Sequence, residues 1–483
     1  MNSLYYGDNL AVLRESIATE SIDLIYLDPP FNSNASYNVL FKAPSGEQSQ
    51  AQIEAFEDTW HWNESAERAF DEVATGPHSD ASIMLRAMRS ALGENDMMAY
   101  LAMMAVRLIE LHRVLRPTGS LYLHCDPTAS HYLKILLDAI FGIDRIANEI
   151  IWCYKRYTAV SNRFQRLHDV ILFYSKSDDR TFNDIRSEYG ELSGKKDSHY
   201  KQDEDGRWFR WQKRVGQEPY KIYLSEGVRL GDWWEIPPIN ASAKERLGYQ
   251  TQKPLALLER IISASSNEGD LVLDPFCGCG TTVHAAQKLK RRWIGIDVTH
   301  LAIALVERRL KEAFPGIVYE VHGVPKDIAG ARDLALRDKH EFQKWITAII
   351  GAQPYKSGKK GMDRGIDGYL HFRDEDRKPQ FGIISVKGGE NITSGMIRDL
   401  KGTMEREKAT IGLFLTLNEP TREMVKEAAS AGFYETGGQK VPRLQILTAE
   451  AILAGAKPRV PFGHTEGFKK AAAEDQTEQG TLL

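Results

Sequence analysis

Long hydrophobic runs and cysteines are scarce in this chain of 483 residues. No apolar run approaches the ~20 residues that a membrane-spanning helix needs. The first thirteen residues show no basic segment followed by an apolar core, so we expect no secretory signal. The four cysteines lack the paired CxxC spacing of zinc sites; they are Cys125, Cys153, Cys277 and Cys279. These absences predict a protein of a reducing cytoplasm.

An excess of basic residues is also missing, since the formal net charge is −4. This charge excludes a protein that coats DNA through bulk positive charge. It leaves room for DNA binding through local basic patches, which can supply the phosphate contacts. Repeats at solenoid periods are absent as well.

What the chain does have, over about its first 320 residues, is an alternation of short apolar runs with longer helical patterns. This alternation is typical of a parallel α/β sheet. Strands are predicted at residues 21–27, 120–124, 270–273 and 293–296, helices at 96–115, 255–264, 281–289 and 301–314, and a turn at 116–119.

Two changes of texture divide the chain. Aromatic and basic residues interleave at about 150–240, which indicates an insertion carried on the sheet. A second unit begins at 325, with helical patterns at 328–337 and 340–350 and strands at 368–372, 381–386 and 411–415. We expect domains at 1–324 and 325–456, and a flexible tail at 457–483.

The first chemical motif is Asp28-Pro29-Pro30-Phe31, directly after a predicted buried strand. The prolines rigidify the turn and offer carbonyls without N–H donors. With the Asp28 carboxylate they form a cup of acceptors that suits an amino group with two N–H bonds. Phe31 would give a planar ring a face for stacking. The plain alternative is a proline-rich turn with an aspartate that caps a helix.

The second motif is a strand that runs into a glycine-rich loop at residues 271–282. Glycines there allow a ligand close to the backbone. The loop is neither the dinucleotide GxGxxG nor a Walker loop, which disfavours a pyrophosphate ligand. The next predicted strand ends at Asp297, where an acidic side chain can bind ribose hydroxyls. The pair predicts a nucleoside site with these residues: Asp274, Phe276, Gly278, Gly280, Thr281 and Asp297.

The third motif, at residues 249–254, contains Lys253 just before a predicted helix. A lysine there could bind a carboxylate, such as the amino-acid end of a cofactor. The alternative is a solvated lysine in the first turn of the helix.

These motifs, in the order DPPF, TQKP, LVLDPFCGCGTT and GID, resemble the β-class DNA amino-methyltransferases over residues 1–322. The resemblance implies a Rossmann-like methyltransferase sheet with an inserted target-recognition region, S-adenosylmethionine as cofactor and double-stranded DNA as substrate. Asp8 and Asn9 resemble a family loop near the cofactor, and residues 56–60 a segment beside the catalytic pocket. The resemblance to this family also implies two candidate partners, a second copy of the chain in a homodimer and a cognate restriction endonuclease.

The resemblance assigns the reaction to Asp28, Pro29, Pro30 and Phe31. Asp28 and the Pro29 carbonyl would accept the two amino protons, and Phe31 would clamp a base flipped out of the duplex. Relatives with a leading Asp mostly methylate N6 of adenine, and those with a leading Ser mostly N4 of cytosine. The absence of a Pro-Cys dipeptide argues against methylation at C5 of cytosine.

Two basic and aromatic stretches in the insertion, 153–168 and 207–214, are candidates for phosphate contacts and stacking. Taken alone they would be a solvated face; inside a methyltransferase insertion we favour DNA recognition. The candidate residues are Lys155, Arg156, Arg163, Arg166, Arg207, Arg210, Lys213 and Arg214. His124-Cys125-Asp126, at the end of a predicted strand, is interpreted as scaffold.

In the second unit, Asp367 precedes one predicted strand and Lys387 ends the next. Residues 335–450 thereby resemble the Mrr-like branch of the PD-(D/E)xK nucleases, a smaller α/β restriction-endonuclease-like domain, with Glu341 as a further acid. Ser385 stands where that family has Glu or Gln, which weakens a Mg²⁺ site at Asp367 without excluding it. The rival interpretation is a nuclease-like module that only binds DNA.

The sequence thus predicts a site-specific N6-adenine DNA methyltransferase of a restriction-modification system, with no metal in the methyltransferase domain. Three alternatives stay open: an N4-cytosine methyltransferase, a bifunctional methyltransferase-nuclease, and a DNA-binding protein with a relic methyltransferase fold. Analysis of the methylated base separates the first from the prediction. Mg²⁺-dependent cutting that Lys387→Ala abolishes would support the second. Cofactor binding without turnover would support the third.

Overall fold

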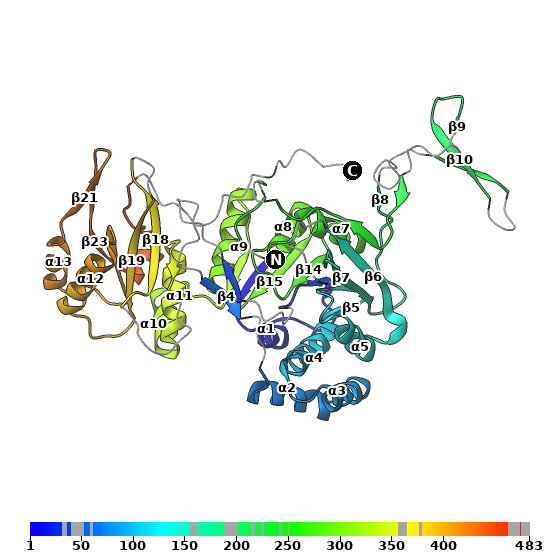
Figure 1. Ribbon diagram of the computed structural model, residues 1–483, viewed down its shortest axis with the longest axis horizontal. Coiled ribbons are helices and arrows are strands. Elements are labelled where there is room, and N and C mark those ends of the chain that lie inside the picture. The colour runs from blue at the N-terminus through cyan, green and yellow to red at the C-terminus, as the bar shows by residue number, and fades with distance from the viewer. Residues whose placement is uncertain are drawn as a thin grey trace.

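The computed structural model describes most of the chain, in segments separated by gaps (Figure 1). The described residues are 1–30, 36–39, 53–57, 61–154, 162, 164–187, 201–213, 218–223, 227–240, 243, 245–249, 251–355, 365–375, 379–461 and 474. In this part of the chain, no helix has the length and apolar character that crossing a membrane requires.

A sheet of nine strands forms the centre of the larger domain, in the order β13-β6-β7-β5-β2-β14-β15-β1-β16. Every neighbouring pair is parallel except the two that involve β7, which is antiparallel to β5 and β6. The strands are β1 (Ser3–Tyr6), β2 (Ile22–Leu27), β5 (Leu115–Cys125), β6 (Ile146–Cys153), β7 (His168–Ser175), β13 (Trp233–Glu235), β14 (Leu271–Asp274), β15 (Arg292–Asp297) and β16 (Glu320–His322). The predicted α/β fold class is confirmed.

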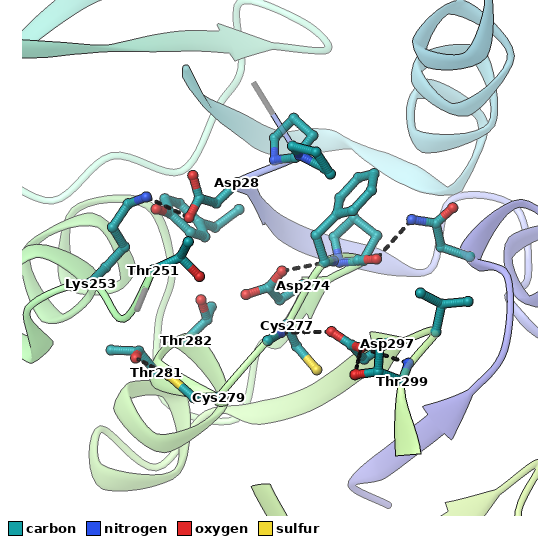
Figure 2. Close-up of a pocket in the computed structure, with 18 of the residues that line it drawn as sticks. Asp28, Thr251, Lys253, Asp274, Cys277, Cys279, Thr281, Thr282, Asp297 and Thr299 are labelled. Carbon is teal, nitrogen blue, oxygen red and sulfur yellow. Dashed lines mark hydrogen bonds and ion pairs between the residues drawn. The ribbon is translucent and has the colours of Figure 1, made fainter. Parts of the chain in front are cut away.

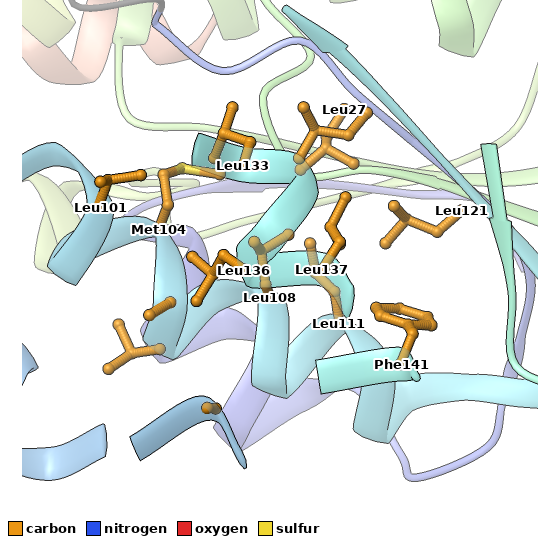
Figure 3. Close-up of a cluster of buried hydrophobic side chains, with 14 of the residues drawn as sticks. Leu27, Leu101, Met104, Leu108, Leu111, Leu121, Leu133, Leu136, Leu137 and Phe141 are labelled. Carbon is orange, nitrogen blue, oxygen red and sulfur yellow. The ribbon is translucent and has the colours of Figure 1, made fainter. Parts of the chain in front are cut away.

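Helices cover both faces of this sheet, because consecutive strand residues point to opposite faces. Leu27 packs with helices α1, α4 and α5, whereas the preceding Tyr26 packs with α7, α8 and α9. Figure 3 shows Leu108 and Leu111 of α4 beside Leu136 and Leu137 of α5. The helices are α1 (Asn9–Ser16), α2 (Glu64–Thr75), α3 (Ser79–Leu92), α4 (Asp96–Val114), α5 (Ser130–Phe141), α7 (Leu255–Ser265), α8 (Thr281–Lys288) and α9 (His300–Ala313).

The region expected as an insertion, about 150–240, shares in the main sheet. It contributes β7, β13 and the second half of β6. The part that leaves the sheet lies between β7 and β13 and carries five short strands: β8 (Arg186–Ser187), β9 (Lys201–Gln202), β10 (Trp208–Gln212), β11 (Tyr220–Tyr223) and β12 (Val228–Arg229). Strands β9, β10 and β11 form an antiparallel arm, residues 201–223, that extends away from the body of the domain (Figure 1).

The smaller domain has its own five-stranded sheet, in the order β17-β18-β19-β20-β23. Its strands are β17 (Gln353–Pro354), β18 (Gly368–Arg373), β19 (Pro379–Lys387), β20 (Ile411–Thr416) and β23 (Leu444–Thr448), with a hairpin of β21 (Phe433–Thr436) and β22 (Gln439–Pro442). Its helices are α10 (Ile328–Arg337), α11 (Lys339–Ile349), α12 (Ser394–Glu407), α13 (Arg422–Ala429) and α14 (Ala449–Leu453). The remaining elements are β3 (Ser36–Val39), β4 (Ile53–Glu57) and a 3₁₀ turn at Ile143–Arg145.

The structure describes the predicted turn at 116–119 and part of the predicted tail. The turn predicted at 116–119 lies within β5, where the pairing with β2 shifts register between Ile22 and Leu24, so these residues form an irregularity in the ladder. The predicted tail, 457–483, is described at 457–461 and at Glu474. There the Glu474 N–H donates to the Ala313 carbonyl at 2.9 Å, and its carboxylate lies 2.9 Å from His284 Nε2.

Candidate active site

The carboxyl ends of β1, β2, β14 and β15 meet at one edge of the main sheet, because these strands are parallel neighbours. This edge carries a cavity of about 400 Å³. Asp28 lies just after β2, Asp274 ends β14 and Asp297 ends β15, and all three line the cavity. Figure 2 shows Asp28 and Lys253 on one side of it and Asp297 with Thr299 on the other.

The glycine-rich loop needs glycine at two positions. Gly278 has φ +48°, and a Cβ there would lie 3.4 Å from the Tyr249 ring. Gly280, at the start of α8, has φ +73°, and a Cβ there would lie 2.8 Å from Val306. Other residue types are strained at positive φ, so the pattern of glycines follows from the backbone path around the cavity.

Asp297 holds this loop in place. Its Oδ2 accepts a hydrogen bond from the Gly278 N–H at 2.9 Å, and its Oδ1 accepts from the Thr299 N–H and hydroxyl, both at 2.8 Å. Burial raises the pKa of Asp297 to about 6, although these donors act in the opposite direction. The carboxylate is therefore both a wall of the cavity and the tie between β15 and the glycine-rich loop.

Asp274 has the larger pKa shift of the two carboxylates. It is 4% exposed and accepts a hydrogen bond from the Phe276 N–H at 3.0 Å and a side-chain hydrogen bond from Thr282. Burial raises its pKa to about 7, and the nearby charges of Asp28 and Asp297 add to the shift. A buried carboxylate of this kind suits a ligand that brings hydrogen-bond donors or positive charge.

Arg107, on α4, connects the Asp8-Asn9 loop to the cavity. Its Nη2 donates to Asp8 Oδ1 at 2.8 Å and its Nε donates to Asn9 Oδ1 at 2.7 Å. Asn9 in turn donates to the Pro275 carbonyl at 2.8 Å. Arg107 was not among the predicted site residues. The signal available in the sequence was a single arginine inside the apolar stretch of residues 97–109.

Asp28 forms an ion pair with Lys253. The Lys253 ammonium donates to Asp28 Oδ2 at 2.6 Å, and the two side chains are only 14% and 16% exposed. The other oxygen, Asp28 Oδ1, is buried and has no hydrogen-bond partner within the described part of the chain. Pro29 and Pro30 line the same cavity. Phe31 lies outside the described residues, as do residues 58–60 of the segment predicted beside the pocket.

A family model described as DNA methylase matches residues 22–308, more than half of the chain. The chain belongs to the DNA methylase family. A second model, described as restriction endonuclease, matches residues 335–435. Both resemblances inferred from the motifs are thereby confirmed at the level of family, and the larger domain has the fold of S-adenosylmethionine-dependent methyltransferases acting on DNA.

Named relatives match the same region. The chain is 28% identical over 359 residues to the type II methyltransferase M.EcaI of Enterobacter cloacae, covering 64% of this chain and 69% of the relative. It is 32% identical over 211 residues to M.HpaI of Haemophilus parainfluenzae, covering 43% and 59%. It is 26% identical over 317 residues to the DNA adenine methyltransferase YhdJ of Escherichia coli, covering 64% and 83%.

Among solved structures, a DNA modification methylase of Thermus thermophilus, TTHA0409, is 19% identical with a TM-score of 0.37, covering 67% of this chain and all of that chain.

The cavity gathers nearly all predicted cofactor residues. Asp8, Asn9, Lys253, Asp274, Phe276, Gly278, Thr281 and Asp297 line it, together with Arg107, Tyr249, Thr251, Thr282 and Thr299, which were not predicted. Gly280 stands behind it as the N-cap of α8. Buried carboxylates without full compensation, backbone approachable at glycines and largely apolar walls fit a nucleoside with an attached ammonium group. The individual cofactor contacts stay predictions.

The structure describes half of the predicted DNA-binding residues. Arg207, Arg210 and Lys213 are exposed on the β9–β11 arm. Arg207 pairs with Asp203 and Asp205 of the same turn, so part of its charge is compensated locally. Arg166 donates to the Thr128 hydroxyl at 3.4 Å. Lys155, Arg156, Arg163 and Arg214 lie outside the described residues.

His124, interpreted as scaffold, is fully buried at the end of β5. Its Nδ1 lies 2.8 Å from the Tyr26 hydroxyl and its Nε2 3.2 Å from Asp169 Oδ2. Asp169 also accepts from the Tyr154 hydroxyl at 2.9 Å. This network ties β2, β5 and β7 together next to Asp28.

In the smaller domain, Asp367 and Lys387 are brought to the paired ends of β18 and β19. Asp367 Oδ2 accepts from the Val386 N–H at 2.6 Å, and Ser385 is buried. Glu341, the predicted further acid, has a different place: its Oε2 accepts from the Tyr6 hydroxyl at 2.5 Å and its Oε1 from Lys344 at 2.7 Å. In the described residues, no three His, Cys, Asp or Glu side chains form a metal-binding group. These contacts do not favour a metal role for Glu341.

Proposed function

We propose that this protein transfers a methyl group from S-adenosylmethionine to N6 of adenine in double-stranded DNA, as the modification enzyme of a restriction-modification system. The observation that carries the proposal is Asp28 Oδ1, a buried acceptor left without a partner in the described structure, beside a cavity that fits the cofactor. The amino group of a target base offers two N–H donors, so one of them can donate a hydrogen bond to this oxygen.

The choice of adenine rests on the leading Asp of Asp28-Pro29-Pro30 and on YhdJ, a relative named as a DNA adenine methyltransferase. The names of the relatives M.EcaI and M.HpaI, both type II methyltransferases, support a role in restriction-modification.

The proposed mechanism assigns each step to a residue of this chain. Bound S-adenosylmethionine would supply an electrophilic methyl carbon. Asp28 Oδ1 and the Pro29 carbonyl would accept hydrogen bonds from the two N–H groups of the amino group. These hydrogen bonds would direct the nitrogen lone pair at the methyl carbon. Transfer of that methyl group to the nitrogen would release the cofactor sulfur as a neutral thioether, and one proton would leave the nitrogen through Asp28 to solvent. Positioning and electrostatics would provide most of the rate gain.

The DNA would approach the carboxyl edge of the main sheet with its target base flipped out. We propose that the arm and the stretch around Arg166 contact the phosphates, and Phe31 the base. A homodimer and a separate cognate endonuclease belong to the same proposal. We place the methyltransferase domain at residues 1–324 and the restriction-endonuclease-like domain at 325–456.

A bifunctional methyltransferase-nuclease is the second candidate, because Asp367 and Lys387 lie at paired strand ends in a domain that matches a restriction endonuclease model. Incubation of the purified chain with DNA and Mg²⁺ tests it. Cutting that Lys387→Ala abolishes would establish the activity. In this proposal Asp367 would hold Mg²⁺ weakly, because Ser385 stands where the family has Glu or Gln.

The first test of the main proposal is sequencing of modified bases in a methylation-free host that expresses the chain or its Asp28→Ala variant. We expect N6-methyladenine in one sequence motif with the native chain and none with the variant, whose cofactor affinity stays within about twofold. N4-methylcytosine would overturn the base assignment. Methylation retained in the variant would overturn the mechanism, and the absence of any modification with the native chain would overturn the function.

A further inference from the structure

Lys253 stands where two cavities meet. It lines the cavity of about 400 Å³ and also an adjoining one of about 210 Å³, whose walls include Trp152, Tyr154 and Asp169. Its ammonium lies 2.6 Å from Asp28 Oδ2, although the two residues are 225 positions apart in the chain.

The loop that carries Lys253 is held rigidly. Gln252 accepts a hydrogen bond from the Leu247 N–H at 2.8 Å and donates to the Glu245 carbonyl at 2.7 Å. The Glu245 carboxylate accepts from the Leu255 N–H, at the start of α7, at 3.2 Å. These bonds fix the backbone from which the Lys253 side chain extends, and that side chain is largely buried where its ammonium meets Asp28.

The ion pair gives the two Asp28 oxygens different surroundings. Oδ2 is occupied by Lys253, and Oδ1 is the buried oxygen without a partner. A carboxylate that could turn about its last bond would present either oxygen; one held at Oδ2 presents Oδ1 in a constant direction. The ammonium also compensates a negative charge that would otherwise be buried alone, which is strongly unfavourable.

We infer that Lys253 is a positioning residue for methyl transfer, which holds Asp28 through Oδ2 so that Oδ1 meets the target amino group. The inference rests on the proposed function. It competes directly with the prediction that Lys253 binds the carboxylate of the cofactor, and the two roles affect different measured quantities.

The test uses the full chain with Lys253→Met, which keeps the length of the side chain and removes its charge. We expect the equilibrium dissociation constant for S-adenosylhomocysteine to stay within about twofold of the native value. We expect the single-turnover rate of methyl transfer, with cofactor and DNA saturating, to fall about 10²-fold, the loss typical of a misplaced reacting group. Lys253→Arg, which keeps the charge, should recover part of the rate.

The matched control is Lys288→Met, because Lys288 also pairs with a glutamate, Glu259, at 3.0 Å but lies outside the cavity. Its rate and cofactor affinity should equal those of the native chain.

Two results would overturn the inference. One is a saturated rate for Lys253→Met within threefold of native; combined with cofactor affinity weakened tenfold or more, it would assign Lys253 to the cofactor instead. The other applies if Lys253→Met does not fold: a Lys253→Ala variant that folds normally and keeps a saturated rate within threefold of native. Native chain that methylates cytosine N4 would change the proposed base and leave the inference standing, whereas native chain that methylates nothing would remove both.

Discussion

Three aspartates at one edge of the main sheet differ in how their charge is compensated. Asp28 is paired with Lys253, Asp297 accepts three hydrogen bonds from its own neighbourhood, and Asp274 accepts one backbone bond and one bond from Thr282. The differences follow from the residue types next to each carboxylate. Asp274 is therefore the carboxylate on which a ligand or a change of pH acts most strongly.

We expect the contribution of Asp274 to the stability of the protein without cofactor to fall as the pH rises from about 4 to about 7. Burial raises the pKa of Asp274 to about 7, whereas an unfolded aspartate titrates near ~3.9. In this window the folded Asp274 binds more proton than the unfolded one, so its contribution to the free energy of unfolding decreases with pH and is fully present only below about pH 4.

Asp274→Asn should remove this contribution, because asparagine does not titrate, so the slope of the free energy of unfolding against pH should be more positive in the variant than in the native chain. Urea unfolding at several pH values, followed by tryptophan fluorescence, measures the slope for native and variant chains. Equal slopes would show that Asp274 titrates normally in the folded state.

At the scale of elements, α4 holds the site to the core. Its N-cap, Asn95, accepts from the Met98 N–H at 2.9 Å, and Arg107 reaches the Asp8-Asn9 loop. The helix is buried on most sides, and its Leu108 and Leu111 lie beside α5 (Figure 3). A nearly apolar helix is stable here because its surroundings are apolar on most sides. Loosening its packing would displace Arg107 and with it the cofactor loop.

Leu108→Ala should lower the free energy of unfolding by about 2–5 kcal/mol, since Leu108 is fully buried and the truncation leaves a cavity. The control is Ile83→Ala on α3, where the side chain is 66% exposed and a change within about 0.5 kcal/mol is expected. Chemical denaturation of both variants decides; similar losses at the two positions would contradict the assigned core.

At the scale of the whole molecule, Glu341 connects the two domains. It comes from α11 of the smaller domain and accepts from the Tyr6 hydroxyl, and His300 Nε2 lies 3.6 Å from the same carboxylate. The rings of Tyr6 and His300 are stacked with centroids 3.7 Å apart. Burial lowers the pKa of His300 to about 4, so the ring is neutral near pH 7. Tyr6 and His300 directly precede and follow residues that line the cavity at the edge of the main sheet.

Glu341→Ala should weaken this contact between the domains. Tryptic cleavage after Lys326, just before α10, should then be several-fold faster than in the native chain. The reason is that Tyr6 would lose its acceptor in a half-buried position, which weakens the docking of α11. Glu423→Ala is the control, because Glu423 is exposed and pairs only locally, with Lys426. Unchanged cleavage in Glu341→Ala would mean that apolar contacts alone hold the domains together.

By itself, the sequence determined the fold class, the position of most predicted strands and helices to within one or two residues, and the motifs that line the cavity. Hydrophobic periodicity and the need for glycine at positive φ are local properties, so they can be read along the chain.

Only the tertiary structure decided which distant residues meet. Strands β2 and β14 are neighbours although about 245 residues separate them, and this neighbourhood brings Lys253 to Asp28. The same holds for Arg107 at the Asp8-Asn9 loop, for β7 and β13 in the main sheet, and for Glu341, which contacts Tyr6. Such contacts depend on strand order and domain docking, which no local pattern encodes.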